Sequence, residues 1–393
     1  MKTPQAVVAG HICLDILPAM GDIRCAPEEL LVPGKLVNVG PPLLATGGAV
    51  SNTGVAMHRL GVPVRLVGKV GNDLFGHAVL ELLNRAGAGL ADGMVVADGE
   101  HTSYTVVINP PEIDRIFLHC PGANDTFRAA DVTTTAVRGA RLFHFGYPPL
   151  MRRMFLDEGR ELVEMLARVR SLGPAVSLDL SLPDPASEAG RVEWQTVLEK
   201  ALPHVDVFLP SLDEILFMLD RPRWEQMRRA GEILPQVDDK LLSELADRLI
   251  AMGAAVVGLK LGEQGLYLRT AGDAGRIRAA KLLARESAWR ERELLAPCLE
   301  VRVAGTTGAG DCTIAGFLAA LLHGLGPEQA AGAAVATGAF NVEAPDATSG
   351  IPPWDRVQAR LDSRPARRAV RLKLAGWRED KKRGLRLSPR DAR

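Results

Sequence analysis

The sequence predicts an α/β protein with a mostly parallel central sheet and helices on both faces of that sheet. Short apolar runs alternate with longer runs of helical periodicity, which is the pattern of repeated βαβ units. Glycine makes up 39 of the 393 residues, more than the average of roughly 7%, and several glycines stand where a predicted helix stops. This length allows one large α/β domain with an appendage, or roughly two to three smaller domains.

The composition excludes several classes of function. The chain has 47 basic and 47 acidic residues, so its formal net charge is zero. A protein that binds nucleic acids or membrane surfaces over its whole face would carry a clear basic excess. Aromatic residues are only 5% of the chain, which argues against a platform that stacks single-stranded bases. We therefore expect neither nucleic acid nor a membrane as a general partner.

Cysteine usage and hydropathy predict a cytoplasmic protein. The cysteines are scattered, with no C-x-x-C pair and no zinc-ligand spacing, which disfavours a disulfide framework or structural zinc. No apolar run reaches the roughly 18 residues needed to span a membrane. Asp15 interrupts the apolar stretch near the N-terminus, so no signal peptide is predicted. The five cysteines are Cys13, Cys25, Cys120, Cys298 and Cys312.

The elements of the first half follow from apolar periodicity and glycine punctuation. Residues 25–44 are rich in proline, glycine and short β-like stretches, so we expect a small sheet there, outside the core. A hairpin over 103–119 is a candidate to pair with it. The expected elements are a strand over 6–9 and 12–17 broken at Gly10-His11, a helix over 49–60, a strand over 62–70, a helix over 75–85 and strands over 103–108 and 115–119.

The second half continues the alternation and then departs from it twice. Residues 276–300 are rich in charge and are predicted to be an insertion, with an exposed helix over 280–295. The tail, residues 355–393, carries a charge of +9 and the body before it −9. We expect the tail to be a solvated helix packed on the acidic body, with an arm for RNA or another polyanion as the alternative. The regular elements are strands over 140–145, 175–180, 205–209 and 255–261 and helices over 154–171 and 241–252.

The densest chemical signal is the loop Gly305 to Asp311, which enters an apolar helix that stops at Gly324. A glycine loop at a helix N-terminus presents backbone N–H groups and the positive end of the helix dipole, which attract an anion. An aspartate in the first turn is placed to take a proton from a substrate hydroxyl, as aspartates do in other phosphoryl-transfer enzymes. The alternative is a tight turn in which Asp311 only caps the helix.

Two other motifs are excluded. The run Gly308-Ala309-Gly310 continues to Thr313 where a dinucleotide-binding fingerprint needs glycine, and no P-loop sequence occurs anywhere in the chain.

The loop and four other stretches resemble the PfkB, or ribokinase-like, carbohydrate kinases. Together the five matches span residues 5–353 in the order of the family. The resemblance implies a three-layer α/β/α sandwich as a kinase domain over 1–354, with a small β lid formed by about 22–46 and 100–121. The basic extension 355–393 lies outside it. The matching stretches are Thr306 to Asp311, Gly47 to Asn52, Gly68 to Gly76, Gly10 to Asp15 and Lys260 to Gly265.

The resemblance implies a role for each matched residue, with ATP as the phosphoryl donor. Asp311 would be the base, and the N–H groups of Gly308, Ala309 and Gly310 would stabilise charge on the transferred group. The substrate would be held by Asp15, Gly47, Gly48, Asn52 and Asn124. The nucleotide would be held by Lys260, Gly262, Gly265, Thr307 and Asn341. Arg115 would belong to the lid.

Three departures from the family pattern bear on cofactors. Gly305 stands where the signature usually has aspartate, which puts activation by a monovalent cation in doubt. The stretch that positions Mg²⁺ through water keeps Glu214 but has Ser211 in place of asparagine. Mg²⁺ is still expected, because phosphoryl transfer needs charge neutralisation on the phosphates. Ala49 replaces a lysine found in some sugar kinases, so the ribose-specific pattern is not met.

The sequence thus predicts an ATP-dependent kinase that phosphorylates a primary hydroxyl of a sugar or sugar-like alcohol. One alternative is a nucleoside kinase of the same family, for which Phe117, Phe145 and Tyr147 are the candidate pocket aromatics. A second alternative is an idle sugar-binding or regulatory protein. The histidines of the chain receive no role. A homodimer through the lid is expected, because the lid would otherwise leave strand edges unpaired.

Overall fold

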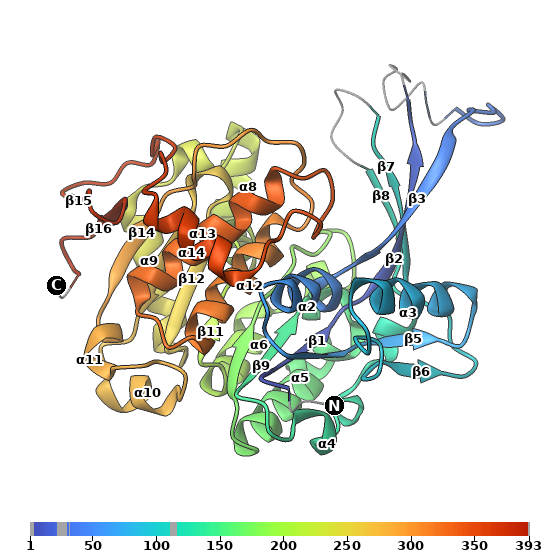
Figure 1. The fold of residues 1–393 in the computed structure, drawn as a ribbon, viewed down its shortest axis with the longest axis horizontal. Coiled ribbons are helices and arrows are strands. Elements are labelled where there is room, and N and C mark those ends of the chain that lie inside the picture. The colour runs from blue at the N-terminus through green and yellow to red at the C-terminus, as the bar shows by residue number, and fades with distance from the viewer. Residues whose placement is uncertain (1–3, 22–29, 31, 111–115, 392–393) are drawn as a thin grey trace.

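The computed structural model describes residues 4–21, 30, 32–110 and 116–391, and its largest element is a ten-stranded sheet (Figure 1). Six neighbouring strands of this sheet are parallel and the others extend it in antiparallel fashion. In spatial order the strands are β15 (Arg378–Asp380), β16 (Leu385–Leu387), β14 (Glu293–Ala296), β13 (Leu266–Thr270), β12 (Val256–Lys260), β11 (Val207–Phe208), β10 (Ala175–Leu178), β9 (Leu142–Gly146), β1 (Ala6–Gly10) and β4 (Val64–Val67).

Helices cover both faces of this sheet, which confirms the predicted three-layer sandwich. Successive strand residues point to opposite faces: Val8 belongs to one hydrophobic core, and Val7 and Ala9 to the other. The first core is covered by α2 (Ala49–Arg59), α3 (Leu74–Ala86), α12 (Ala309–Leu322), α13 (Pro327–Val342) and α14 (Trp354–Asp362). The second is covered by α5 (Arg152–Ser171), α6 (Trp194–Ala201), α7 (Leu212–Leu219), α8 (Arg221–Ala230) and α9 (Asp239–Ala251), with the short α4 (Thr134–Val137) nearby.

A separate four-stranded sheet projects from the body (Figure 1). Its order is β3 (Gly40–Gly47), β2 (Cys13–Ala19), β7 (Tyr104–Ile108) and β8 (Ile116–Cys120). The predicted hairpin is β7 with β8, and it joins β3 through β2. We call these four strands the lid sheet. Arg115 lies outside the described residues.

The opening strand divides at Gly10, where one prediction needs correction. Gly10 has φ 128°, and a Cβ there would lie 2.2 Å from the carbonyl oxygen of Gly146. Only glycine fits this turn, so the chain leaves the central sheet and starts β2 in the lid sheet. Asp15, which lies in the second part of the predicted opening strand, therefore belongs to the lid sheet. The strand expected over 62–70 likewise divides, into β4 and β5 (Lys69–Gly71), and β5 pairs with β6 (Val95–Ala97).

The exposed helix predicted over 280–295 is wrong. The segment forms α10 (Ala274–Ala279), α11 (Glu286–Trp289) and β14. Trp289 is buried and packs edge-on against Phe317, with 6.3 Å between ring centroids. Arg292 is buried as well, because Glu328 and Asp391 pair with its guanidinium at 2.9 and 3.1 Å. The charge of Arg292 is thus neutralised inside the fold, whereas Lys281, Arg285, Arg290 and Glu291 are exposed.

The basic tail is built into the body rather than forming one solvated helix. Only its first residues continue α14, and its last part adds β16 and β15 to the central sheet beside β14. Asp391, near the end of the described chain, reaches the buried Arg292. The division of the chain at residue 354 stays a prediction, but the described tail shares the sheet of the residues before it. Among the described residues no helix is both long and apolar enough to cross a membrane.

Candidate active site

Polar side chains gather where the parallel strands of the central sheet end. His11 follows β1, Tyr147 follows β9, Asp179 follows β10, and Lys260 is the last residue of β12. In open α/β sheets, ligands bind outside the carboxyl ends of the strands. The first turn of α12, with Asp311, lies against the same ends. This convergence marks the candidate site.

Asp311 is buried, and three side chains donate hydrogen bonds to its carboxylate. The Tyr147 hydroxyl lies 3.0 and 2.8 Å from its two oxygens. Asn52 Nδ2 lies 3.0 Å from Oδ2, and Thr53 Oγ1 lies 3.2 Å from Oδ1. Asn52, predicted to hold substrate, therefore contacts the predicted base directly. The Oδ1 atom of Asn52 is buried and has no hydrogen-bond partner within the described protein, so it can still accept a bond from a hydroxyl.

Burial raises the pKa of Asp311, because a charged carboxylate loses hydration there. Lys260 and the hydrogen bonds from Asn52, Tyr147 and Thr53 oppose this shift. Tyr147 itself has a left-handed backbone, with φ 66°, a conformation that costs free energy for a non-glycine residue and that is enriched at functional sites. Sequence reasoning named Tyr147 only as a pocket aromatic; its role here depends on β9 ending opposite α12.

The loop before Asp311 opens α12 as predicted. Gly308 has φ 73°, and a Cβ there would lie 2.9 Å from the Cβ of Ala347, so both conformation and space favour glycine. The N–H groups of the first helical turn have no carbonyl partner within the helix. Gly310 lies beside Lys260, since a Cβ on it would be 3.6 Å from Lys260 Cδ. The loop and the lysine thus lie side by side.

Lys260 forms a buried ion pair with Asp179, with 2.5 Å between Nζ and Oδ1. Burial alone would lower the pKa of Lys260, but the charges of Asp179, Glu214 and Asp311 outweigh it and raise that pKa. Burial raises the pKa of Asp179, against the effect of Lys260. Sequence reasoning missed Asp179, although an aspartate directly after a buried strand was the available signal.

Glu214 lies at the start of α7, where it forms a capping box with Ser211. Ser211 N donates to Glu214 Oε2 at 2.7 Å, and Glu214 N donates to Ser211 Oγ at 3.2 Å. The described residues contain no group of three side chains suited to grip a metal ion directly. The carboxylates that raise the pKa of Lys260 nevertheless fit a cation held through water and phosphate. The metal role of Glu214 stays a prediction.

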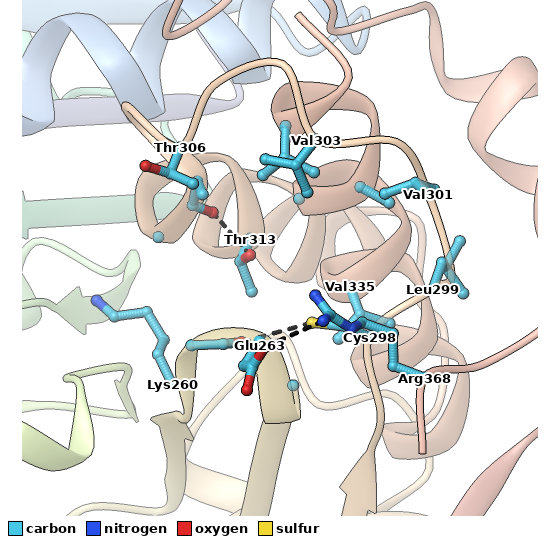
Figure 2. A pocket seen from close by; sticks show the side chains of 17 residues that line it. Lys260, Glu263, Cys298, Leu299, Val301, Val303, Thr306, Thr313, Val335 and Arg368 are labelled. Atoms are coloured by element: carbon cyan, nitrogen blue, oxygen red, sulfur yellow. Dashed lines mark hydrogen bonds and ion pairs between the residues drawn. The ribbon is translucent and has the colours of Figure 1, made fainter. Parts of the chain in front are cut away.

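A cavity of about 330 Å³ opens beside this cluster (Figure 2). Of the residues predicted to bind nucleotide or transferred phosphate, Lys260, Gly262, Gly265, Ala309 and Gly310 line it. Val335, Ala339 and Val342 of α13 make one side of it apolar. We call it the α13 pocket.

Two predicted nucleotide residues do not line the α13 pocket. Asn341 is buried, and its Nδ2 donates to the carbonyl oxygens of Thr307 and Ala347 at 3.0 and 2.7 Å. It therefore holds the loop in place instead of facing the pocket. Thr307 does not line the pocket either, although its neighbour Thr306 does.

The predicted substrate glycines make room for two polar side chains. A Cβ on Gly47 would lie 2.3 Å from Asp15 Oδ2. A Cβ on Gly48, which has φ 88°, would lie 2.5 Å from Nδ1 of His11. Asn124, predicted to hold the substrate, is fully buried, and its amide pairs with the backbone of Ile12, at 2.9 Å as donor and 3.2 Å as acceptor. Its substrate role stays a prediction.

His11 is a polar residue of this region that sequence reasoning left without a role. Its side chain is buried, and neither ring nitrogen has a hydrogen-bond partner within the described protein. Its ring centroid lies 5.3 Å from that of His119 in β8 of the lid sheet and 6.1 Å from that of Tyr147. Burial, and then the nearby His119, lower the pKa of His11 to about 3, so the imidazole is neutral.

The three aromatic candidates for a nucleoside pocket do not come together. Phe145 is buried in the core beside Phe127. Tyr147 is engaged with Asp311. Phe117 is 56% exposed on the lid sheet. These three aromatic rings therefore do not form a pocket that would stack on the nucleobase of a nucleoside acceptor.

Comparisons with known proteins agree on one family. The family model described as pfkB family carbohydrate kinase matches residues 12–354. An uncharacterized sugar kinase of Archaeoglobus fulgidus is 25% identical over 298 residues, 76% of this chain and 98% of that protein. The 2-dehydro-3-deoxygluconokinase of Bacillus subtilis is 25% identical over 338 residues, 84% of this chain and 90% of that protein.

Solved structures share the fold. The ribokinase of Arabidopsis thaliana, complexed with ribose and ATP, superposes with a TM-score of 0.68 at 20% identity, covering 91% of this chain and 98% of that one. The fructokinase of Xylella fastidiosa with bound ATP gives a TM-score of 0.67 at 20% identity, with the same coverage. At these identities the likeness shows the three-layer fold alone.

Proposed function

Because the chain belongs to the pfkB family of carbohydrate kinases, we propose that it transfers the terminal phosphoryl group of ATP to a primary hydroxyl of a sugar or sugar-like alcohol. The observation that carries this proposal is the position of Asp311. It is a buried carboxylate directly after Ala309 and Gly310, which line the α13 pocket, and it accepts hydrogen bonds from Asn52 and Tyr147. A carboxylate beside the pocket proposed for the nucleotide can take the proton of an acceptor hydroxyl during such a transfer.

Asp311 is the base in this proposal. The acceptor oxygen attacks the terminal phosphorus, the bond from that phosphorus to the bridging oxygen of ADP breaks, and the hydroxyl proton passes to the Asp311 carboxylate. Asn52, Thr53 and Tyr147 hold the carboxylate in one orientation. Orientation of this kind lowers the barrier, because the reacting groups need no further ordering.

The glycine loop and Lys260 serve the phosphates. Backbone N–H groups at the start of α12 and the positive end of its dipole stabilise the negative charge of the transferred group. Lys260 lies along this loop and lines the α13 pocket, so its ammonium group meets the phosphate oxygens at the same end. Gly262 and Gly265 border the rest of the nucleotide.

Mg²⁺ completes the proposal as a cofactor carried in with ATP. Such an ion neutralises phosphate charge when it is bound. Glu214 would orient its water ligands, since this carboxylate is fixed at the head of α7 by Ser211. Its charge acts on Lys260 at the phosphate end of the pocket.

His11 and Asp15 are proposed to contact the acceptor. They lie against the glycine pair and do not line the α13 pocket, and the lid sheet carries Asp15 and His119. A neutral imidazole can donate from one nitrogen and accept at the other. The unsatisfied nitrogens of His11 therefore suit hydroxyl or carbonyl groups of a small polyol, and each unbonded polar atom disfavours an acceptor that cannot bond to it.

A homodimer through the lid sheet is also proposed. Apolar side chains on both outer strands of that sheet are exposed, namely Leu43 (56%), Leu44 (43%), Phe117 (56%) and Leu118 (52%). Exposed apolar side chains on an edge strand can be buried by a second copy of the chain, and an outer strand leaves backbone groups unpaired.

Replacing Asp311 with asparagine tests the chemical step. We expect D311N to lower kcat roughly 10²–10⁴-fold while ADP affinity, measured by calorimetry, changes little. D355N is the matched control, because Asp355 also lies in the first turn of a helix but is exposed. The assay is ADP release with a panel of sugars, sugar acids, polyols and nucleosides. The proposal would be overturned if none of these alcohols supported ADP release, or if turnover survived in D311N. ADP release with nucleosides alone would favour the nucleoside kinase.

Replacing Tyr147 with phenylalanine tests the state of the base. The Tyr147 hydroxyl lowers the pKa of Asp311, so its removal raises that pKa. Because the base acts when deprotonated, the acid limb of the kcat/KM profile shifts to higher pH, and activity near neutral pH falls roughly tenfold. The control is Y267F, which removes a buried hydroxyl bonded to Glu293. An acid limb that stays in place in Y147F would contradict the role of Tyr147.

Replacing His11 with phenylalanine tests the acceptor contact. H11F keeps an aromatic ring but loses both nitrogens, so KM for the best acceptor should rise roughly tenfold or more, with KM for ATP unchanged. H144F is the control, because His144 is equally buried but is bonded to Ser177. Equal acceptor KM values in H11F and wild type would exclude the contact.

Light scattering tests the dimer. We expect about twice the chain mass of 42.2 kDa for the wild type, and the monomer mass for the double variant L43E/F117E. A wild-type monomer at all concentrations would refute the interface.

A further inference from the structure

The C-terminal segment supplies an arginine to the α13 pocket. The family match ends at residue 354, yet Arg368 lines this pocket (Figure 2). We propose that residues 366–371 form a wall of the nucleotide site and that the guanidinium of Arg368 packs on the base of bound ATP. This inference rests on the proposed function, because it takes the α13 pocket as the site of the nucleotide.

Backbone pairing fixes the segment along the rim of the pocket. Glu300 N donates to the carbonyl of Ala366 at 3.0 Å, and Arg368 N donates to the carbonyl of Cys298 at 2.9 Å. Leu299 and Arg367 form an antiparallel bridge between these two bonds. Cys298 and Leu299 line the pocket themselves. The segment therefore runs as an added strand against the chain that forms the rim.

Side chains fix the same segment to the loop on the other side. Glu263 lines the pocket and pairs with Arg368 at 3.0 Å, and Arg371 pairs with the same carboxylate. Arg371 N also donates to Oε1 of Gln264 at 2.7 Å. The loop 262–265, whose glycines belong to the proposed nucleotide site, is thus held from outside by the tail.

Arg368 lies where we expect the nucleobase of ATP, and not its phosphates, to bind. Figure 2 places Arg368 beside Cys298 and Val335, across the pocket from Lys260 and Thr306. The Lys260 end is the phosphate end, because the glycine loop lies there. At the opposite end the apolar side chains of Val335 and Leu299 lie beside Arg368, and such a surface suits a flat nucleobase.

A guanidinium suits this position for two physical reasons. It is planar and weakly hydrated, so it stacks on aromatic rings. Arg368 also keeps a partner in Glu263 without being enclosed, since its side chain is 43% exposed. Two arginines share the single carboxylate of Glu263, so these three side chains together carry a net positive charge. Positive charge beside the pocket attracts a polyphosphate.

The test compares two tail arginines of similar exposure, each of which pairs with a carboxylate of the body. R368A should raise KM for ATP and the dissociation constant for ADP roughly 3- to 30-fold, with acceptor KM unchanged. R390A is the matched control, because Arg390 pairs with Asp247 and does not line the pocket; it should change nucleotide affinity less than about twofold. R368K keeps the positive charge but lacks the planar guanidinium, so it should recover little of the loss. Equal effects of R368A and R390A, or full recovery in R368K, would overturn the contact with the nucleobase.

Protection of Cys298 from alkylation tests where the nucleotide binds and does not depend on turnover. The Cys298 thiol is at the Arg368 end of the pocket, and burial raises its pKa, so alkylation is followed at alkaline pH by peptide mass spectrometry. ADP should slow the labelling of Cys298 several-fold and leave that of Cys120, on the lid sheet, unchanged. Unprotected Cys298 would overturn the inference. If the wild type binds no ADP by calorimetry, the proposed function fails; if ADP binds but R368A matches the wild type, the inference alone fails.

Discussion

The ion pair between Lys260 and Asp179 is the interaction on which the site depends. It joins the ends of β10 and β12, and its ammonium group faces the negative charges of Glu214 and Asp311 as well. Buried carboxylates crowd together only where a cation offsets their repulsion and lost hydration. Removing one partner of such a pair costs about 3–5 kcal/mol. The same lysine lines the α13 pocket, so the group that balances the buried acids is also the group that would meet phosphate.

The glycine pair Gly47-Gly48 leaves space that two polar side chains occupy. Gly48 leaves room for the ring of His11, and Gly47 leaves room for the carboxylate of Asp15. Each allows a close approach that a Cβ would block or crowd. His11 lies beside Tyr147, and the Tyr147 hydroxyl is bonded to Asp311, so polar groups of the lid side and of α12 are linked.

The net charge of zero arises because the body and the tail of the chain carry equal charges of opposite sign. The body carries −9 and the tail +9, and the structure pairs them: tail arginines contact Glu263, Asp247 and Glu293 of the body. Several of these pairs are partly exposed and contribute little stability one by one. The buried pair of Arg292 with Asp391 and the strand β16 add to the attachment. The tail charge is thus partly neutralised inside the molecule, and part of it borders the α13 pocket.

The sequence by itself determined the α/β class, the family, the two glycine motifs and Asp311 as the candidate base. These are local features, since a glycine loop that opens a helix is written in consecutive residues and tolerates few substitutes. The tertiary structure alone placed Asn52 on Asp311 and brought Tyr147, Asp179 and His11 to one site. These residues come from different strand ends, and only the order of the strands in the sheet makes them neighbours. The same holds for the tail. Its composition predicted attraction to the body, but the hydrogen bond from Arg368 N to the carbonyl of Cys298 joins residues far apart in the sequence, and no local pattern encodes it.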